Sequence, residues 1–172
     1  MEVEIGRGKK GRRAYGLDDI AIVPSRRTRD VEDVDITWSI GKHKLELPCL
    51  ASAMDGVVDT KFAGAMGKIG GLAVLNLEGI QTRFENADEQ LEKIAALPAL
   101  QATKGLQEIY QEPVKEELIV QRIKEIKDQG VLAAASLTPQ KVTQYYEMVL
   151  EAGLDVLIIQ GTVVSAEHVS SI

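Results

Sequence analysis

Two short apolar runs in the first half of the chain constrain its fold more than any other feature. Residues 47–52 and 72–75 lack the alternation of a half-exposed strand, a pattern typical of strands covered on both faces of a parallel sheet. Between them, residues 58–68 carry apolar side chains at helical spacing, and Gly70-Gly71 supplies a helix stop. A strand, a helix and a strand joined by short loops predict a right-handed βαβ unit with parallel strands.

A second unit of the same kind follows later in the chain. Residues 132–137 form a strand-like apolar run, and Thr138-Pro139 supplies an N-cap followed by proline at the first helical position. Gly153 ends the helix that begins there. Residues 154–160 carry the strongest strand signal, because β-branched residues stand between turn residues. The sequence therefore predicts four parallel strands.

A connector of about 55 residues joins the two units, and it is too short for an additional domain of typical size. Residues 87–96 and 116–127 carry apolar positions at helical spacing, and Gly130 follows the second segment. We therefore expect the connector to be helical. Ahead of the first unit, residues 18–24 are expected to form a short strand that ends at Pro24.

Charge and cysteine content exclude several classes of protein. The 20 basic and 26 acidic residues give a net charge of -6, which argues against a protein that binds nucleic acid by neutralising phosphates. The basic cluster at residues 7–13 is expected to be a solvated, poorly ordered end. Cys49 is the only cysteine, so no intrachain disulfide is expected, and its place in an apolar run predicts a buried, inert thiol.

Neither a membrane span nor a signal peptide is predicted. No apolar run reaches the roughly 18 to 20 residues that a span needs. The charged start of the chain also lacks the apolar region of a signal peptide. We expect a cytoplasmic protein without a membrane partner.

General motifs for catalysis or metal binding are missing from the sequence. His43 and His168 stand far apart and outside any metal-ligand spacing, so no metal is predicted. In parallel α/β folds the functional groups collect in the loops after the strand C-termini. Those loops begin at residues 52–56, 76–79, 136–139 and 160–162. Taken alone, their polar residues fit N-caps of the following helices, an interpretation that covers Asp55 and Thr138.

Four segments resemble, in order and spacing, the opening of IMP dehydrogenases and GMP reductases. They are residues 15–24, 47–55, 70–76 and 151–159. The resemblance is most specific at Ser52-Ala53-Met54-Asp55. Residues 4–9 are similar to the branch of IMP dehydrogenase-related proteins that lacks the regulatory domain pair. Nearly the whole chain is covered.

The resemblance implies an α/β fold, a (β/α)8 TIM barrel of which this chain holds about the first four β/α units. Residues 1–45 would be a lead-in segment, and residues 46–172 the amino-terminal half of a barrel that is cut short. The resemblance further implies a homotetramer that acts on a purine nucleotide, IMP or GMP, with NAD or NADP as the cofactor. The activity would be oxidation of IMP to XMP or reduction of GMP to IMP.

Matching the family's motifs gives roles to particular residues. Ser52 would contact the nucleotide, Met54 would pack on its base or ribose, and Asp55 would support the loop. A hydroxyl beside a backbone turn is a suitable donor to phosphate or ribose, and a thioether suits a flat base. The resemblance places four residues beside the cofactor: Thr138, Gln160, Gly161 and Thr162.

The chain also departs from the family's pattern. Gln160 stands where the family usually carries an aspartate, and an amide cannot accept two ribose hydroxyls as an anion does. The histidine that many dehydrogenases carry near Asn76-Leu77 is missing, and the connector is too short for the paired regulatory domain.

Two elements of the family's chemistry have no counterpart in this chain. These are the loop cysteine that attacks the purine ring and the glycine-rich loop that holds the nucleotide phosphate. We therefore expect the chain to be inactive by itself. IMP oxidation, GMP reduction and a non-catalytic nucleotide-binding or assembly module stay open, as does the pairing of half-barrels with one another.

Overall fold

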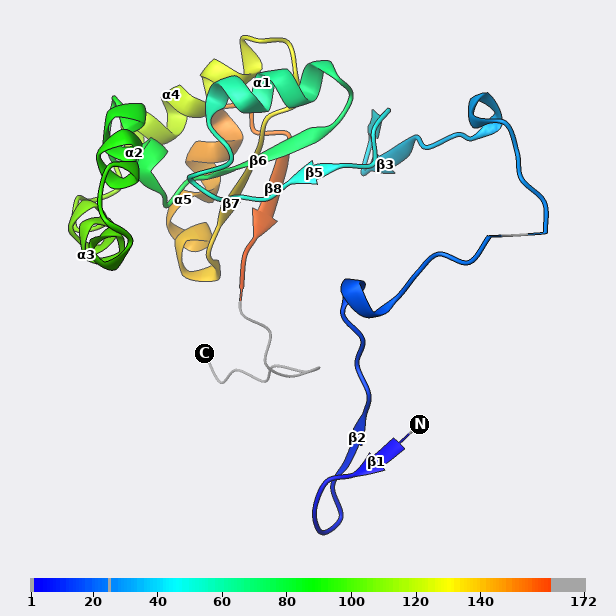
Figure 1. Ribbon diagram of the computed structural model, residues 1–172. Helices are drawn as coiled ribbons and strands as arrows, with labels where there is room; N and C mark the ends of the chain where they lie inside the picture. The colour runs from blue at the N-terminus through cyan, green and yellow to red at the C-terminus, as the bar shows by residue number, and fades with distance from the viewer. Residues whose placement is uncertain (1, 25, 162–172) are drawn as a thin grey trace. The chain divides into compact units, whose positions relative to one another are not determined.

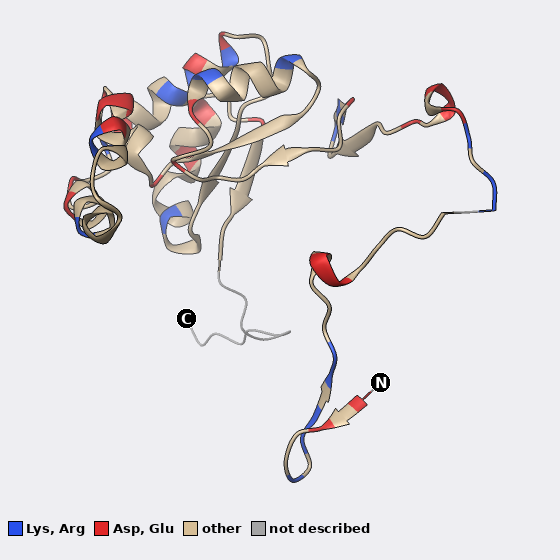
Figure 2. Ribbon diagram, viewed as in Figure 1, with Lys and Arg blue, Asp and Glu red and all other residues tan. Residues whose placement is uncertain are grey.

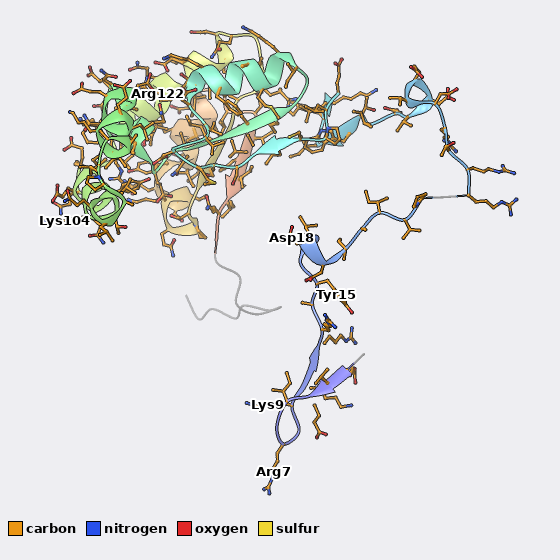
Figure 3. All side chains as sticks on the ribbon, viewed as in Figure 1. Arg7, Lys9, Tyr15, Asp18, Lys104 and Arg122 are labelled. Atoms are coloured by element: carbon orange, nitrogen blue, oxygen red, sulfur yellow. The ribbon has the colours of Figure 1, made fainter. Side chains whose placement is uncertain are left out.

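The computed structural model describes residues 2–24 and 26–161, and the chain divides into two units, Met1–Asp35 and Ile36–Ile172 (Figure 1). In the first unit, β1 (Glu2–Glu4) and β2 (Lys10–Arg12) form an antiparallel hairpin. The basic cluster occupies this hairpin and its turn, where Arg7 and Lys9 are exposed (Figure 3). Two 3-10 turns follow, η1 (Leu17–Asp19) and η2 (Val31–Asp33).

The strand predicted at residues 18–24 is wrong. In η1 the Gly16 amide donates to the Asp19 carboxylate at 3.0 Å, and residues 20–24 follow without regular structure. Ile22 is 99% exposed. Branched apolar residues favour a strand only when a neighbouring strand pairs with them, and the described residues of this unit offer none to residues 18–24.

The second unit is built on a parallel sheet of four strands: β5 (Leu50–Ala51), β6 (Leu72–Asn76), β7 (Ala134–Leu137) and β8 (Val156–Ile159). The prediction of four parallel strands is confirmed. Each strand pairs with the next one along the chain, in the order β5-β6-β7-β8. A doubly wound sheet reverses its order at a switch point, whereas this order is that of consecutive strands in a (β/α)8 barrel.

The first strand, β5, is shorter than the predicted run of residues 47–52. Pro48 has no amide hydrogen to donate to a neighbouring strand. Pairing with β6 begins after it, at Leu50 opposite Leu72. Cys49 is exposed at this strand start. The expectation of a buried thiol is therefore wrong, because the apolar run around Cys49 is only partly covered.

Three helices cover one face of the sheet: α1 (Thr60–Lys68), α4 (Glu116–Lys127) and α5 (Pro139–Glu151) (Figure 1). They share a buried core with alternate strand residues; its members include Leu75, Ala135, Ile123 and Val149. The strands β6, β7 and β8 of this sheet carry no charged side chain, whereas its covering helices carry many (Figure 2).

A hairpin covers part of the opposite face of the sheet. Its strands are β3 (Trp38–Ile40) and β4 (His43–Leu45), and the Trp38 indole donates to the Leu47 carbonyl at 2.8 Å. Leu45 of this hairpin packs with Leu72, Val74 and Ala134. Helices on one face only, around strands in sequential order, are the arrangement of a barrel wall.

Helix ends follow the predicted signals at most positions. The glycines after α1, α4 and α5 have φ values of 85°, 75° and 86°, in the left-handed region; they are Gly70, Gly130 and Gly153. Thr138 and Pro139 begin α5 as predicted, although the Thr138 side chain makes no capping hydrogen bond. The N-cap of α1 is Asp59, which accepts from the Phe62 amide at 2.6 Å. The interpretation of Asp55 as a cap is therefore wrong.

The connector is helical, as predicted, and holds one more helix than predicted. It contains η3 (Ile80–Thr82), α2 (Ala87–Ala95), α3 (Ala99–Ile109) and then α4. The additional helix, α3, has no fully buried residue and carries Gly105 in its interior, where glycine weakens the helix signal of the sequence. Gly105 allows α3 to approach α2, because a Cβ there would lie 3.0 Å from the side chain of Ile94.

Asp155 ties the start of β7 to α4. Its carboxylate accepts from Lys127 Nζ at 2.7 Å and from the Ala133 amide at 2.8 Å. Burial opposes ionisation of Asp155, but the hydrogen bonds from Lys127 and Ala133 outweigh it and hold the pKa below its ordinary value. The ionised carboxylate therefore stabilises the junction of helix and sheet.

We predict that Asp155→Asn makes the fold less sensitive to acid. A group whose folded pKa is lowered stabilises the fold above its unfolded pKa, near 3.8 here, and this contribution is lost as the pH falls through the folded value. The variant should be less stable at neutral pH, and its urea midpoint should fall less steeply below about pH 4. Asp128→Asn, at the exposed end of α4, is the control. Equal pH profiles for Asp155→Asn and the unmodified chain would contradict this role.

Candidate functional site

The loops after the parallel strands meet at one edge of the sheet and form a cleft of about 450 Å³. Its lining comes from the loops after β6, β7 and β8 and from the residue after α3, and includes Asn76, Glu78, Thr138, Gln160, Gly161 and Tyr110. The volume falls in the range of small-molecule sites. The position, at the carboxyl ends of parallel strands, is where α/β proteins bind ligands. This cleft is the candidate site.

Asp55 lies in the loop after β5, and its carboxylate is bound by three donors. Oδ1 accepts from Asn76 Nδ2 at 3.3 Å, while Oδ2 accepts from the Ile80 amide at 2.9 Å and from the Tyr110 hydroxyl. The carboxylate also fills the space beside Gly79, where a Cβ would lie 1.8 Å from Oδ1. Asp55 therefore joins the loops after β5 and β6 to the connector.

Glu78 and Arg83 join the remaining walls of the cleft. Glu78 Oε1 accepts from the Thr138 amide at 2.5 Å, which places a carboxylate at the positive N-terminus of α5. Arg83 donates Nη2 to the Glu78 carbonyl at 2.9 Å and Nη1 to the Tyr110 carbonyl at 3.2 Å. Its guanidinium lies 5.0 Å from the centre of the Tyr110 ring. Hydrogen bonds and ring stacking hold these walls together.

The Tyr110 hydroxyl stays protonated near neutral pH and donates a hydrogen bond to the Asp55 carboxylate. Burial, and then the hydrogen bond to Asp55, raise the pKa of Tyr110 well above its ordinary value. A phenol that stays protonated can act only as a donor to a carboxylate. The contact therefore does not depend on pH near neutrality.

The structure gathers most of the predicted site residues at this edge. Thr138, Gln160 and Gly161 line the cleft, and Asp55 reaches it through Asn76 and Tyr110. Ser52 and Met54 share the loop of Asp55 but do not line the cleft, and their side chains are exposed. Thr162 lies outside the described residues.

Arg83 and Tyr110 are site residues that sequence reasoning misses. Tyr110 is 55 positions from its partner Asp55, in a helical insertion without a motif. Arg83 follows the loop after β6, and its polar partners are backbone carbonyls, which leave no mark in a sequence. The one available signal is the glycine at position 79, which marks a place where another group approaches the backbone closely.

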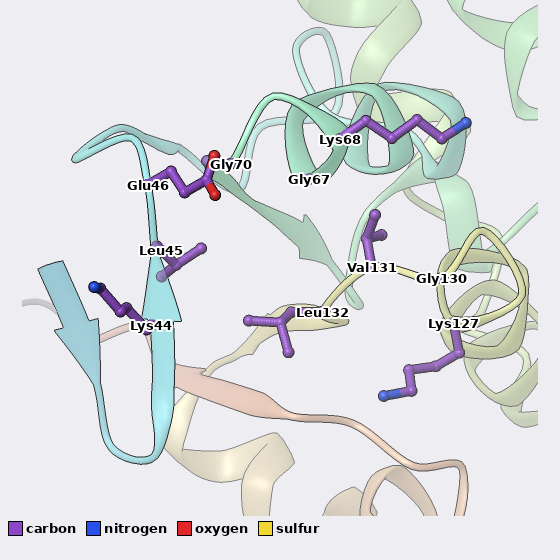
Figure 4. Close-up of a pocket in the computed structure, with 11 residues that line it drawn as sticks. Lys44, Leu45, Glu46, Gly67, Lys68, Gly70, Lys127, Gly130, Val131 and Leu132 are labelled. Carbon is purple, nitrogen blue, oxygen red and sulfur yellow. The ribbon is translucent and has the colours of Figure 1, made fainter. Parts of the chain in front are cut away.

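A second cavity, of about 580 Å³, lies at the opposite end of the strands (Figure 4). It is lined by the β4 segment and by the turns that precede β6 and β7, with Lys44, Glu46, Gly70, Lys127 and Leu132 among the lining residues. Lys127 is already paired with Asp155. In barrels, residues at the amino-terminal end of the strands serve stability rather than chemistry, so this larger cavity is not the candidate site.

Metal binding and membrane insertion find no support in the part of the chain that the structure describes. No cluster of three or more His, Cys, Asp or Glu side chains there could hold a metal ion. His43 lies on β4, and His168 is outside the described residues. None of the described helices is long and apolar enough to cross a membrane.

Comparison with known proteins gives one consistent family. The sequence profile of the IMP dehydrogenase / GMP reductase domain matches residues 14–172. A crystal structure of an IMP dehydrogenase/GMP reductase-like protein from Corynebacterium glutamicum superposes with a TM-score of 0.89 at 43% identity, covering 98% of this chain and 46% of that one. The predicted α/β fold, part of a TIM barrel, is confirmed.

Curated relatives agree with the structural match. Uncharacterized oxidoreductases of Mycobacterium tuberculosis and Mycolicibacterium smegmatis are 40% and 37% identical, each over 98% of this chain and 46% of the relative. The inosine-5'-monophosphate dehydrogenase of Methanocaldococcus jannaschii is 28% identical over 51% of this chain and 16% of its own length. The chain thus spans about half the length of the mycobacterial relatives.

We predict that Gly79→Ala destabilises the fold by about 1–3 kcal/mol, because the new methyl group displaces a carboxylate held by three donors. Gly56→Ala is the matched control, since a Cβ at Gly56 meets nothing within 4 Å. Urea unfolding of both variants measures the difference. The double variant Gly79→Ala/Asp55→Ala should show less than the sum of the two single losses. Equal stability of the two glycine variants would contradict the geometry of this loop.

Proposed function

The chain belongs to the IMP dehydrogenase / GMP reductase family, and we propose that it forms the nucleotide-facing part of an NAD(P)-dependent oxidoreductase that converts IMP to XMP. The observation that carries the proposal is the cleft at the strand ends, where Thr138, Gln160 and Gly161 gather beside the loop that Asp55 anchors. The whole protein would act in purine nucleotide biosynthesis, as a cytoplasmic homotetramer.

The lining of the cleft fits part of a nicotinamide dinucleotide. The Thr138 hydroxyl and the side-chain amides of Asn76 and Gln160 offer neutral donors and acceptors to ribose hydroxyls and a carboxamide. A volume of about 450 Å³ suits the nicotinamide riboside rather than the whole dinucleotide. When bound, NAD or NADP supplies the hydride acceptor. The protein's part is to bind and orient the two nucleotides in line for transfer.

The loop after β5 that carries Ser52, Met54 and Asp55, called the nucleotide loop below, would bind the purine nucleotide. Ser52 would donate its hydroxyl to the phosphate or ribose, and Met54 would pack on the base or ribose. Both side chains are exposed, with Met54 55% accessible, so a ligand can reach them. Asp55 would hold the loop without touching the nucleotide, because its oxygens are engaged by Asn76, Ile80 and Tyr110.

We propose that the nucleophile that attacks the purine ring lies outside the residues of this chain. Cys49 is the only cysteine, and it precedes β5, at the end of the strand opposite to the nucleotide loop. A nucleophile must lie within about 3 to 3.5 Å of the reacting atom. The chain alone would therefore bind weakly and turn over nothing.

The activity is tested on the whole protein that carries these residues. With IMP and NAD or NADP, we expect a rise in nicotinamide absorbance, and the chain alone should give none. A fall in absorbance with GMP and NADPH, with no reaction of IMP, would replace IMP oxidation by GMP reduction. Inactivity with both substrate pairs would refute the enzymatic proposal, and nucleotide binding by calorimetry in that case would favour a non-catalytic module.

We predict that Gln160→Asp tightens cofactor binding. A carboxylate can accept hydrogen bonds from two ribose hydroxyls, and the amide oxygen of Gln160 offers one neutral acceptor. The cofactor KM should fall about fivefold, which corresponds to roughly 1 kcal/mol, while the KM of the purine nucleotide stays the same. Gln140→Asp, an exposed change on α5 outside the cleft lining, is the control. An unchanged cofactor KM in Gln160→Asp would remove Gln160 from the cofactor site.

A further inference from the structure

The part of the connector that holds α2, α3 and the residues up to Lys115 is called the insertion below. It contacts the nucleotide loop through the phenol of Tyr110. We propose that Tyr110 is a positioning residue: it fixes Asp55, and through Asp55 the loop of Ser52 and Met54, so the helical insertion sets the affinity for the purine nucleotide. The inference rests on the proposed function, in which that loop binds the nucleotide.

The contacts of Asp55 single out Tyr110 as the long-range donor. Asn76 is the last residue of β6, which pairs with β5, and Ile80 begins η3 shortly after it. Tyr110 comes from the end of α3 and shares Oδ2 with the Ile80 amide. Without the phenol, Oδ2 would keep one neutral donor, and the loop after β5 would lose its contact with the insertion.

Arg83 holds Tyr110 in place on two sides. It donates to the Tyr110 carbonyl at 3.2 Å and stacks on the ring at 5.0 Å from its centre. It also donates to the carbonyls of Glu112 and Glu78. The phenol is therefore presented to Asp55 by a fixed backbone and a fixed ring, which is the requirement for a positioning residue.

The other described ties of the insertion reach elements outside the nucleotide loop. Asp88 of α2 pairs with Lys61 of α1 at 3.0 Å, α2 contacts η3, and α3 packs on α2. At the carboxyl-terminal end of the insertion, the Lys115 amide donates to the Thr82 carbonyl at 2.9 Å. Exposed side chains such as Lys104 extend away from the sheet (Figure 3). The contact of Tyr110 with Asp55 is thus the route by which this insertion can act on the nucleotide loop.

The test is Tyr110→Phe in the whole protein, because phenylalanine keeps the ring that stacks on Arg83 and removes only the hydroxyl. We expect the purine nucleotide KM to rise about fivefold, the effect of one lost hydrogen bond, with kcat unchanged. Tyr110 also lines the cleft, but its hydroxyl is donated to Asp55, so the cofactor KM should rise less than the nucleotide KM. Tyr146→Phe is the matched control, since that phenol is exposed on α5 and donates to the neighbouring Glu147. Tyr146→Phe should change no kinetic constant.

A double-mutant cycle separates positioning from general stability. Asp55→Ala and Tyr110→Phe should be non-additive in the nucleotide KM, because each removes the same contact, whereas Asp55→Ala and Tyr146→Phe should be additive. An unchanged nucleotide KM in Tyr110→Phe, or an equal loss in both KM values and kcat, would overturn the inference while leaving the proposed function intact. Failure of the unmodified whole protein to bind IMP or GMP would overturn the proposed function, and this inference with it.

Discussion

The carboxylate of Asp55 is the contact on which the order of the strand-end site depends. Strand-end loops carry little apolar surface, so their conformation has to come from polar contacts rather than from burial. One side chain here receives three donors, one from the last residue of β6, one from the segment after it and one from the helical insertion. It also occupies the space that only glycine leaves open at position 79. Because each donor lies on a separate residue, the loss of the carboxylate would leave several polar groups unpaired at once.

The sheet explains why these loops meet at all. The four strands run parallel to one another, so their carboxyl ends all lie at the same edge of the sheet. The helix-facing residues of β6 and β7, such as Leu75 and Ala135, are almost fully buried, and this packing makes the edge a rigid base. The opposite edge is held by Asp155 and Lys127, whose pairing anchors the start of β7. The candidate site and the Asp155 anchor therefore lie at opposite ends of the same strands.

Sequence patterns predicted the elements whose signals are local. Unalternating apolar runs gave the strands, and glycines in the left-handed region, such as Gly153, gave the helix ends. The patterns failed where a distant partner decides the outcome. Residues 18–24 have strand propensity but no neighbouring strand among the described residues, and α3 has a glycine in its interior and packs on α2 without a fully buried residue. Asp55 fits the composition of a helix cap, yet its partners lie up to 55 positions away, a separation that no local pattern contains.

The nucleotide loop combines a fixed backbone with free side chains, and this combination is what ligand binding requires. Asp55 is engaged on both oxygens, whereas Ser52 and Met54 remain exposed. A loop ordered before binding loses little conformational entropy when the ligand arrives, so more of the contact energy appears as affinity. The connector contacts this loop through Tyr110, so in our proposal the loop is ordered before the ligand binds by a residue of the same domain.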